Sequence, residues 1–366
     1  MVNKVPKYME LVNWVKEKIK SKELKSGDKL YSENQLSSMF SMSRQTVRHG
    51  ISILEQQGIV ERIQGSGTYI CNKPKAPKAK TMNIAVVTTY VDRYIFPNVI
   101  KEMEKVISDA GYFTQIAFTY NTLVRESTIL SKFLESNNVD GIIIEPTKSG
   151  LPNPNIKLYE EIMDRGIPML FINSYYPDLP LPHVAMDDRK AGLMAVNHLI
   201  EAGHTKIAGI FKADDRQGHF RYSGFMKGLI DAGLSFNDDN IIWIDTEDTN
   251  HMVDNEGRIL NRIKGCTACV CYNDEVAVPI VEMCKRNNIS VPDDLSIVSI
   301  DDSDLAAYCE VPLTSVAYPI TKLGKKAAQN LLRLIEDSSF DGNHDFSPTL
   351  SIRNSVKRVA GVKESN

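Results

Sequence analysis

Residues 32–58 read SENQLSSMFSMSRQTVRHGISILEQQG. Ser32 precedes Gln35 by three positions, which is the spacing of a helix N-cap with its capping box, so a short helix is expected to start there. A polar break at residues 41–43 separates it from a second helix, expected from Arg44 to Gln57, whose inward side chains are Val47, Ile51 and Leu54. Gly58 is the expected C′ residue of that helix. The stretch therefore predicts a helix–turn–helix.

The flanking segments complete a small domain. Residues 7–22 place lysines on one helical face and apolar side chains on the other, namely Met9, Val12, Val15 and Ile19. Residues 59–71 read IVERIQGSGTYIC, which predicts two short strands joined by a hairpin at residues 65–67. Three helices followed by a two-stranded wing make an α+β winged helix-turn-helix, which we assign to residues 1–72.

The outward end of the second helix carries side chains of the kind that read DNA. Arginine forks onto guanine and glutamine onto adenine in the major groove, and helix N-terminal amides favour a phosphate. The hairpin tip has no bulky side chain, so its backbone can approach the duplex, and a lysine at the first helix can hold a phosphate. The alternative for the Gly-x-Gly of the tip is a dinucleotide loop, but such a loop precedes a helix, whereas strands are expected on both sides here. The predicted DNA contacts are Lys7, Ser32, Arg44, Gln45, Thr46, Arg48, Gln64, Gly65, Ser66, Gly67 and Thr68.

The distribution of charge agrees with this assignment. Residues 1–80 hold 15 Lys and Arg against 7 Asp and Glu, whereas the remainder holds 28 against 39, within a net charge of −3. A basic module thus precedes an acidic one, and only the first suits a polyanion. Charge alone does not distinguish a DNA-binding surface from lysines that only contact solvent. The assignment therefore depends on the helix–turn–helix motif. With 366 residues, 42% hydrophobic and 24% charged, the chain is expected to form folded units and not a disordered protein.

Residues 5–71 closely resemble the GntR family of winged-helix regulators. The resemblance rests on KLYSENQL at residues 29–36, SRQTVR at 43–48, LEQQG at 54–58 and QGSGTY at 64–69. It implies a sequence-specific DNA-binding protein, with Arg44, Arg48 and Gly67 at the DNA.

The segment KPKAPKAK at residues 73–80 is typical of a stiff, charged linker. We therefore predict a linker at 73–81 and an effector domain at 82–366. In that domain apolar strands alternate with amphipathic helices, which favours parallel sheets covered on both faces, and so many βα units suit two doubly wound α/β lobes. Strands are expected near residues 83–89, 114–119, 140–145, 168–173, 206–211, 241–244, 267–272 and 297–301.

Ligands of doubly wound lobes sit beyond the carboxyl ends of the strands. The residues at these positions are rich in Asp, Asn, Glu, Lys and aromatics, which suits a polyol. Carboxylates and amides pair with vicinal hydroxyls, and an aromatic ring covers the apolar face of a sugar. A phosphate would call for more Arg and a Gly-rich helix start. The predicted effector contacts are Thr89, Tyr90, Tyr94, Phe96, Glu145, Lys148, Asn173, Asp187, Phe211, Lys212, Asp214, Arg221, Asn273 and Asp301.

The chain from Met82 to about Arg358 resembles the LacI/GalR regulators and periplasmic sugar-binding proteins. The resemblance rests on VAMDD at 184–188, RYSGF at 221–225, CYND at 271–274, VPDDLSIVSIDD at 291–302 and LTSV at 313–316. It implies two lobes that close around a sugar held by Arg221, Asn273 and Asp301. A GntR-type head on such a body further resembles the arabinose-responsive repressors, a match strengthened by TTY at 88–90, EPTKS at 145–149 and FKADD at 211–215. That resemblance implies L-arabinose as the effector that releases the operator.

Some of these residues have a second interpretation. Asp188 and Asp302 cap the following helices in one alternative, and Tyr94 and Phe96 belong to the core or to a dimer contact in another. The CxxCxC run at residues 266–271 hints at a metal, but no second Cys/His pair completes a tetrahedral set. We therefore predict no metal and no cofactor.

The expected protein is a homodimer on an imperfect DNA palindrome. Six Cys in no regular spacing, with no signal-like segment and no long apolar run, favour a cytoplasmic protein with reduced thiols and no membrane contact. The sequence shows no phosphate-cradling loop and no nucleophile–His pair, so an enzyme is not expected. Two alternatives stay open: an enzyme on a sugar-binding scaffold, and the same architecture serving another sugar, a nucleoside or a sugar phosphate.

Overall fold

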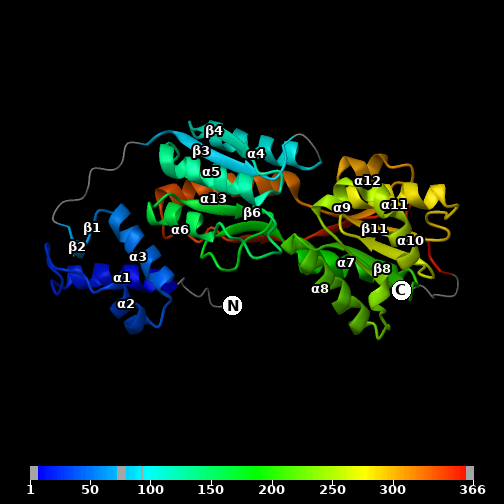
Figure 1. Ribbon diagram of the computed structural model, residues 1–366, viewed down its shortest axis with the longest axis horizontal. Coiled ribbons are helices and arrows are strands. Elements are labelled where there is room, and N and C mark those ends of the chain that lie inside the picture. Colours follow the sequence, from blue (N-terminus) through cyan, green and yellow to red (C-terminus); the bar gives the residue numbers. More distant parts are fainter. Residues whose placement is uncertain (1–6, 72–79, 92–93, 360–366) are drawn as a thin grey trace.

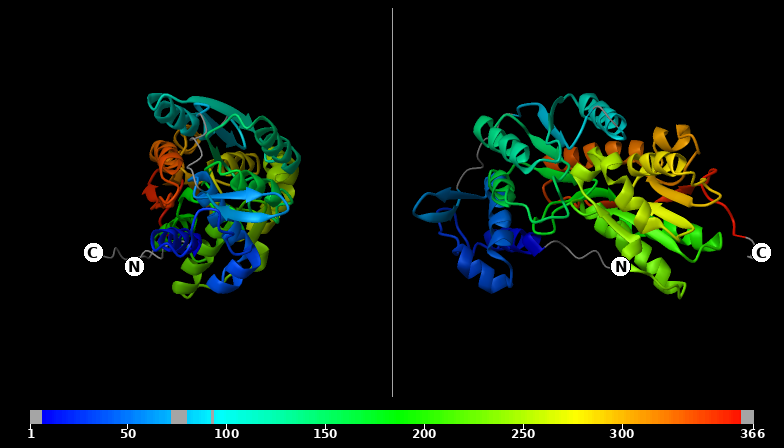
Figure 2. Two further views of the ribbon diagram at one scale, coloured as in Figure 1. Left: turned by 90° about the vertical axis from the view of Figure 1, so that its left-hand side faces the viewer. Right: turned by 45° about the vertical axis from the view of Figure 1, so that its right-hand side comes forward.

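The computed structural model describes residues 7–71, 80–91 and 94–359. Three bodies follow one another along its long axis (Figure 1): a head of residues 7–71, then an N-lobe and then a C-lobe. The two rotated views agree that the head adjoins the N-lobe end of the molecule (Figure 2). Residues 73–79 of the predicted linker lie outside the described ranges.

The head is the predicted winged helix-turn-helix, and its helices begin where the sequence indicates. Ser32 accepts a hydrogen bond from the Gln35 amide, and the Gln35 side chain accepts one from the Ser32 amide, which completes the capping box. Ser43 caps the next helix, and Gly58 follows its end with a φ of 65°. The elements are α1 (Lys7–Lys20), α2 (Glu33–Phe40), α3 (Arg44–Gln56), β1 (Val60–Ile63) and β2 (Gly67–Ile70).

The N-lobe is a parallel sheet covered on both faces. Successive residues of each strand point to opposite faces, so Ile84 and Val86 pack with α4 and α13, whereas Ala85 and Val87 pack with α5 and α6. The strand order is β4-β3-β5-β6-β7-β13. The elements are β3 (Asn83–Thr88), α4 (Phe96–Asp109), β4 (Phe113–Phe118), α5 (Leu123–Ser136), β5 (Gly141–Ile144), α6 (Ile156–Asp164), β6 (Met169–Ile172), β7 (His183–Met186), α13 (Ile320–Glu336) and β13 (His344–Phe346).

The C-lobe repeats the plan, with the order β9-β8-β10-β11-β12-β14 and only β14 antiparallel. Helices α7 and α8 cover one face, and α10 and α11 cover the other. The elements are α7 (Asp188–Glu201), β8 (Ile207–Lys212), α8 (Arg216–Asp231), β9 (Ile241–Ile244), α9 (Thr246–Asn250), α10 (Glu256–Ile263), β10 (Ala268–Cys271), α11 (Asp274–Arg286), β11 (Ser296–Asp301), α12 (Asp304–Tyr308), β12 (Thr314–Ala317) and β14 (Thr349–Ser351), with 3-10 turns at Asp238–Asn240 and Met252–Asn255.

All eight predicted strands are present, but the sequence analysis did not predict β7, β12, β13 or β14. Each is only three or four residues long, which is too short for periodicity to separate a strand from a loop. The chain crosses between the lobes after β7, after β12 and after β13. Within the described ranges, no helix is long and apolar enough to cross a membrane.

Two glycines let α7 and α8 approach each other closely. A methyl group added at Gly192 would overlap the carbonyl of Arg221, and one added at Gly224 would overlap the carbonyl of Arg189. Backbone cannot yield as a flexible side chain can, so both positions require glycine. This contact fixes where α8 presents Arg221 beneath the cleft between the lobes.

We predict that Gly224→Ala lowers the free energy of unfolding by about 1–3 kcal/mol or more, because the added methyl forces the two helices apart. The matched control is Gly257→Ala on α10, where an added Cβ meets nothing within 4 Å. That change is expected to raise stability by up to about 1 kcal/mol, since alanine favours a helix. Urea unfolding followed by circular dichroism measures both. Equal midpoints for the two variants would contradict the packing argument.

Candidate functional site

The carboxyl ends of β3, β5 and β6 face those of β8, β10 and β11 across the cleft between the lobes. A cavity of about 80 Å³ lies between them. The sequence of each lobe places polar residues at these ends, where parallel strands all stop at one edge. The cavity brings together ten of the fourteen predicted effector contacts, namely Thr89, Tyr90, Tyr94, Phe96, Glu145, Asn173, Lys212, Arg221, Asn273 and Asp301.

The guanidinium of Arg221 lies at the base of the cavity, and the residue is only 1% exposed. Its Nε donates to Asp188 Oδ1 at 2.8 Å, Nη1 to the Tyr272 carbonyl at 2.7 Å, and Nη2 to Asp301 Oδ1 at 3.0 Å. Burial raises the pKa of Asp188 to about 7, although Arg221 acts in the opposite direction. One guanidinium thus pairs with two buried carboxylates. Burial, together with the charge of Asp301, favours the protonated form of Asp188.

On the N-lobe side, the Glu145 carboxylate is held by its own lobe. Oε2 accepts from the amide and the hydroxyl of Thr89 at 2.7 and 2.6 Å, and Oε1 accepts from Asn173 Nδ2 at 2.7 Å. Burial raises the pKa of Glu145, while these donors oppose the shift. The carboxylate has lone pairs beyond these three bonds, so it can accept from a ligand hydroxyl as well.

On the C-lobe side, the ammonium of Lys212 lies at the end of β8. Its Nζ donates to Asp215 Oδ2 at 2.7 Å and lies 3.7 Å from Asp214 Oδ1. Burial lowers the pKa of Lys212, but the two carboxylates outweigh burial and hold the pKa above its ordinary value. The cavity therefore offers a charged donor from one lobe opposite a carboxylate from the other.

The two lobes touch across the cleft, so the structure is a closed form. Tyr94 Oη donates to Asp301 Oδ2 at 2.6 Å, and Asn121 Nδ2 donates to Thr246 Oγ1 at 2.7 Å. A backbone contact joins the Gly150 amide to the Asp214 carbonyl at 3.0 Å. Each pair takes one member from each lobe, so opening the cleft would break all three.

Four predicted effector contacts do not line the cavity. Asp187 caps α7 by accepting from the Lys190 amide at 3.0 Å. Phe211 stands one position before the end of β8, so its ring points under α8 and packs in the core. Lys148 and Asp214 pair at 3.8 Å between the lobes without lining the cavity.

The alternative that Asp188 and Asp302 cap the following helices is wrong, because other residues hold the N-cap positions. Asp188 is the first residue of α7 and pairs with Arg221, because Asp187 already holds the N-cap position. Asp302 pairs with Arg353 at 2.6 Å, and the N-cap of α12 is Ser303.

Eight cavity-lining polar or aromatic residues were not predicted: Asn121, Ser149, Ser174, Asp215, Gln217, Thr249, Tyr272 and Glu275. Ser149, Ser174 and Asp215 directly follow a predicted contact, and Tyr272 directly precedes one, so a wider window at each strand end would have found these four. Thr249 belongs to the short helix α9, which no sequence signal indicated.

A buried carboxylate organises the loop between β5 and α6. Glu126 accepts from Tyr159 Oη at 2.7 Å and from Tyr176 Oη at 2.9 Å. It also accepts from the amide of Thr147 and from the side chains of Asn153 and Asn155. The loop that carries Pro146 and Ser149 into the cleft is thus tied to α6, the helix nearest the head.

In the head, the predicted DNA contacts surround the start of α3 and the wing. Arg44 is exposed at the first position of α3, and the Thr46 hydroxyl lies 2.8 Å from Ser43 Oγ. Arg48 lies 3.5 Å from Glu33 Oε2 and 4.0 Å from Asp164 Oδ2 of the N-lobe. In the wing, Gly65 and Gly67 have φ values of 75° and 128°, which only glycine adopts freely. The others lie in the tip (Gln64, Ser66, Thr68), at the cap of α2 (Ser32) and at the start of α1 (Lys7).

The cysteine run has a structural setting. Cys269 and Cys271 are buried in β10, on the face covered by α10 and α11. Burial raises the pKa of Cys266 to about 11, which keeps its thiol protonated. Across the described residues, no group of three His, Cys, Asp or Glu side chains is arranged to hold a metal.

Comparison with known proteins matches both parts of the chain. Residues 7–70 match the bacterial regulatory proteins of the gntR family, and residues 196–356 match the periplasmic-binding-protein-like domain. An arabinose metabolism transcriptional repressor of Halalkalibacterium halodurans is 39% identical, over 96% of this chain and 98% of the relative. One of Geobacillus stearothermophilus is 36% identical, over 97% and 99%.

Solved structures agree on the fold. A complex of the transcriptional regulator CelR with cellobiose aligns with a TM-score of 0.67 at 21% identity, over 85% of this chain and 90% of that one. The regulator CcpA of Lactococcus lactis aligns with a TM-score of 0.67 at 23% identity, over 75% and 99%. The predicted head family and the two-lobed α/β fold are confirmed, and all of these relatives are transcription regulators.

We predict that Asp188→Asn flattens the fall of stability between pH 5 and 7. The folded protein keeps a proton on Asp188 up to about pH 7, whereas the unfolded chain releases it near the ordinary value of 3.8. Stability from this group is therefore lost as pH rises through that window, by at most about 1.4 kcal/mol per pH unit. Thermal melts at stepped pH measure the slope. The exposed Asp231→Asn is the control, and a parallel slope for the two variants would exclude Asp188 as the titrating group.

Proposed function

Because the chain belongs to the family of arabinose metabolism transcriptional repressors, we propose that it holds the operator of arabinose-utilisation genes and releases it when L-arabinose enters the cleft. It is a DNA-binding repressor with a gntR-family head and a sugar-type effector domain. The observation that carries the effector part is the closed cleft, where Glu145, Lys212 and Arg221 from two lobes meet around one small cavity.

The chemistry of the cavity favours a neutral polyol. Carboxylates and amides accept and donate to vicinal hydroxyls, and the rings of Tyr90 and Phe96, 5.9 Å apart, form an apolar wall for a sugar face. A sugar phosphate is disfavoured, because both cations of the cavity already pair with carboxylates and Glu145 adds negative charge. The polar lining thus supports a pentose over a phosphorylated ligand.

Release of the operator requires that the closed form of the cleft binds the sugar more tightly than the open form. A ligand shifts an equilibrium only by its difference in affinity for the two states. A sugar that bonds Glu145 on one lobe and Asn273 on the other binds the closed cleft more tightly than the open one. In a cytoplasmic homodimer on a palindromic operator, this closure changes the spacing of the two heads. The protein performs no chemical step on the sugar.

The direct test is operator binding at fixed salt with and without L-arabinose. We expect a promoter fragment of the arabinose genes to bind more tightly than random duplex, and saturating L-arabinose to weaken that binding at least tenfold. Fixed salt is essential because phosphate contacts make DNA affinity salt-dependent. D-Xylose and a pentose phosphate serve as comparison ligands, and a turnover assay on pentoses tests the enzyme alternative. Unchanged operator affinity at saturating sugar would defeat this mechanism.

We predict that Asn273→Asp shifts sugar control to higher sugar concentrations and leaves operator binding in place. Asn273 Oδ1 accepts from the Val276 amide and caps α11, and an aspartate keeps that bond. It loses the amide donor and adds a charge beside Asp301, so the sugar should bind about 10- to 100-fold more weakly. Asn237→Asp is the control, since Asn237 caps a 3-10 turn in the same way but is exposed. Calorimetry with L-arabinose measures the affinity, and wild-type heats for Asn273→Asp would remove this residue from the site.

A further inference from the structure

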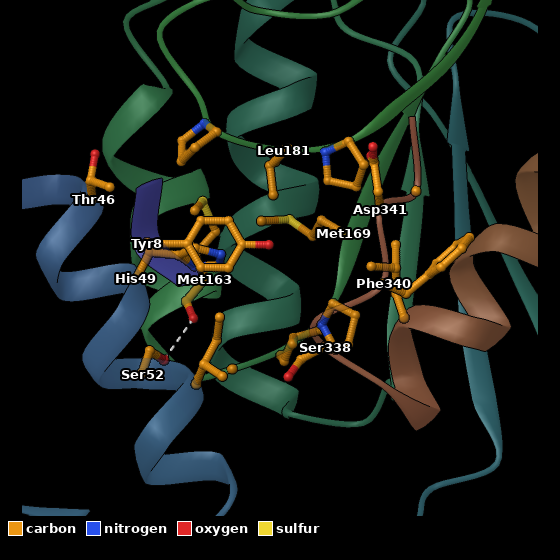
Figure 3. Close-up of a pocket in the computed structure, with 18 of the residues that line it drawn as sticks. Tyr8, Thr46, His49, Ser52, Met163, Met169, Leu181, Ser338, Phe340 and Asp341 are labelled. Carbon is orange, nitrogen blue, oxygen red and sulfur yellow. Dashed lines mark hydrogen bonds between the residues drawn. The ribbon is translucent and has the colours of Figure 1, made fainter. Parts of the chain in front are cut away.

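The head rests on the C-terminal end of α6. The hydroxyl of Ser52, in the middle of α3, lies 3.0 Å from the carbonyl oxygen of Met163 (Figure 3) and 2.9 Å from that of Asp164, so its one proton is shared between them. The last carbonyls of a helix have no partner within the helix. The Met163 carbonyl accepts from the Gly166 amide at 2.8 Å, and Ser52 adds a contact from outside to it and to Asp164. Ser52 is only 2% exposed, and both of its side-chain hydrogen bonds go to the N-lobe. The contact is therefore specific to the docked head.

The docked surface includes the DNA-reading end of α3. Arg44, Gln45 and Arg48 share a crevice of about 350 Å³ with Glu160 and Asp164 of α6. The carboxylates of α6 carry the same sign of charge as a phosphate backbone. A duplex that approached these three side chains would meet both the bulk and the negative charge of α6.

The docked state leaves polar atoms of the head unsatisfied. Gln45 Nε2 and His49 Nδ1 are buried and have no hydrogen-bond partner among the described residues. A buried donor without a partner costs free energy. The docked arrangement therefore leaves the Gln45 amide nitrogen out of solvent without the hydrogen bonds that a base edge would provide.

The interface is also loosely packed. A cavity of about 360 Å³ separates α1 and α3 from the N-lobe, with Tyr8 and His49 on one side and Met163, Leu181 and Phe340 on the other (Figure 3). An open cleft between two surfaces forfeits the dispersion contacts that a filled interface would make. The head is thus held by the shared hydrogen bond of Ser52 and by a long bond from Gln57 Nε2 to Ser338 Oγ at 3.4 Å, beside an open cleft, which makes the contact weak enough to be reversible.

We infer that the C-terminal end of α6 is a docking site for the recognition helix α3 of the chain's own head, and that docking and operator binding exclude each other. The inference rests on the proposed function, in that α3 reads the operator. In the DNA-free protein, the end of α6 then competes with operator DNA for binding to α3. Weakening the dock frees the head, and the apparent operator affinity rises by the same factor as the docking constant falls.

The test measures operator binding by full-length Ser52→Ala without sugar and at fixed salt. We expect roughly two- to tenfold tighter binding, the factor that corresponds to one hydrogen bond of ordinary net strength. A second variant, Glu160→Gln/Asp164→Asn, weakens the dock from the N-lobe side and should act in the same direction. The controls are Ser21→Ala, an exposed serine of the head, and Glu247→Gln/Asp254→Asn, which removes two exposed charges from the C-lobe.

Hydrogen exchange of residues 156–169 in the DNA-free protein reports docking itself. Exchange should be faster in Ser52→Ala and unchanged in Ser21→Ala. Unchanged exchange and unchanged operator affinity in both dock variants would overturn the docking site. Faster exchange with unchanged affinity would overturn mutual exclusion. If the wild type bound no operator while exchange still rose in Ser52→Ala, the proposed function would fail and the docking contact would stand.

Discussion

The effector domain depends on one buried guanidinium. An unpaired buried charge costs several kcal/mol, and removing one partner of such a pair costs about 3–5 kcal/mol. Arg221 is therefore tolerated only because α7 supplies Asp188, β11 supplies Asp301 and β10 leads to the Tyr272 carbonyl. The close contact of α7 and α8 at their glycines brings Asp188 of α7 within hydrogen-bond distance of Arg221 on α8. Since Tyr94 of the N-lobe also bonds Asp301, the same cluster fixes the geometry of the closed cleft.

The polar groups of the cleft are largely satisfied within their own lobe before a ligand arrives. Glu145 is held by Thr89 and Asn173, and Lys212 is held by Asp215. Such pre-pairing keeps side chains oriented without a ligand and lowers the entropy lost on binding. A ligand that entered the cleft would therefore meet groups that are already in place. The apolar residues behind them, alternating along each strand, keep those strand ends rigid.

Sequence predicted most of this arrangement because its signals are local. The Ser32–Gln35 capping box, the Gly58 helix end and the glycine wing each depend on a few adjacent residues, and all are present. The misses arose where the answer depends on distant segments. Phe211 was predicted as a ligand because strand parity at the end of β8 is visible only in the fold. The contact of Ser52 with α6 joins residues more than a hundred positions apart, and no local pattern encodes it.

The hydrogen bonds of Glu126 join the loop at the cleft to α6, the helix that contacts the head. Its carboxylate binds Thr147 and Asn153 in the cleft loop and Tyr159 on α6, so loop and helix form one hydrogen-bonded unit. A buried carboxylate with this many donors is held in place, since losing any one of them leaves a buried polar group unpaired. Ser149 of that loop accepts from the Arg216 amide of the C-lobe at 3.0 Å, so the loop that meets the C-lobe in the closed form is also the loop tied to α6. The C-terminal end of α6 is where Ser52 of α3 is bound, so α6 lies between the loop that reaches the cleft and the head.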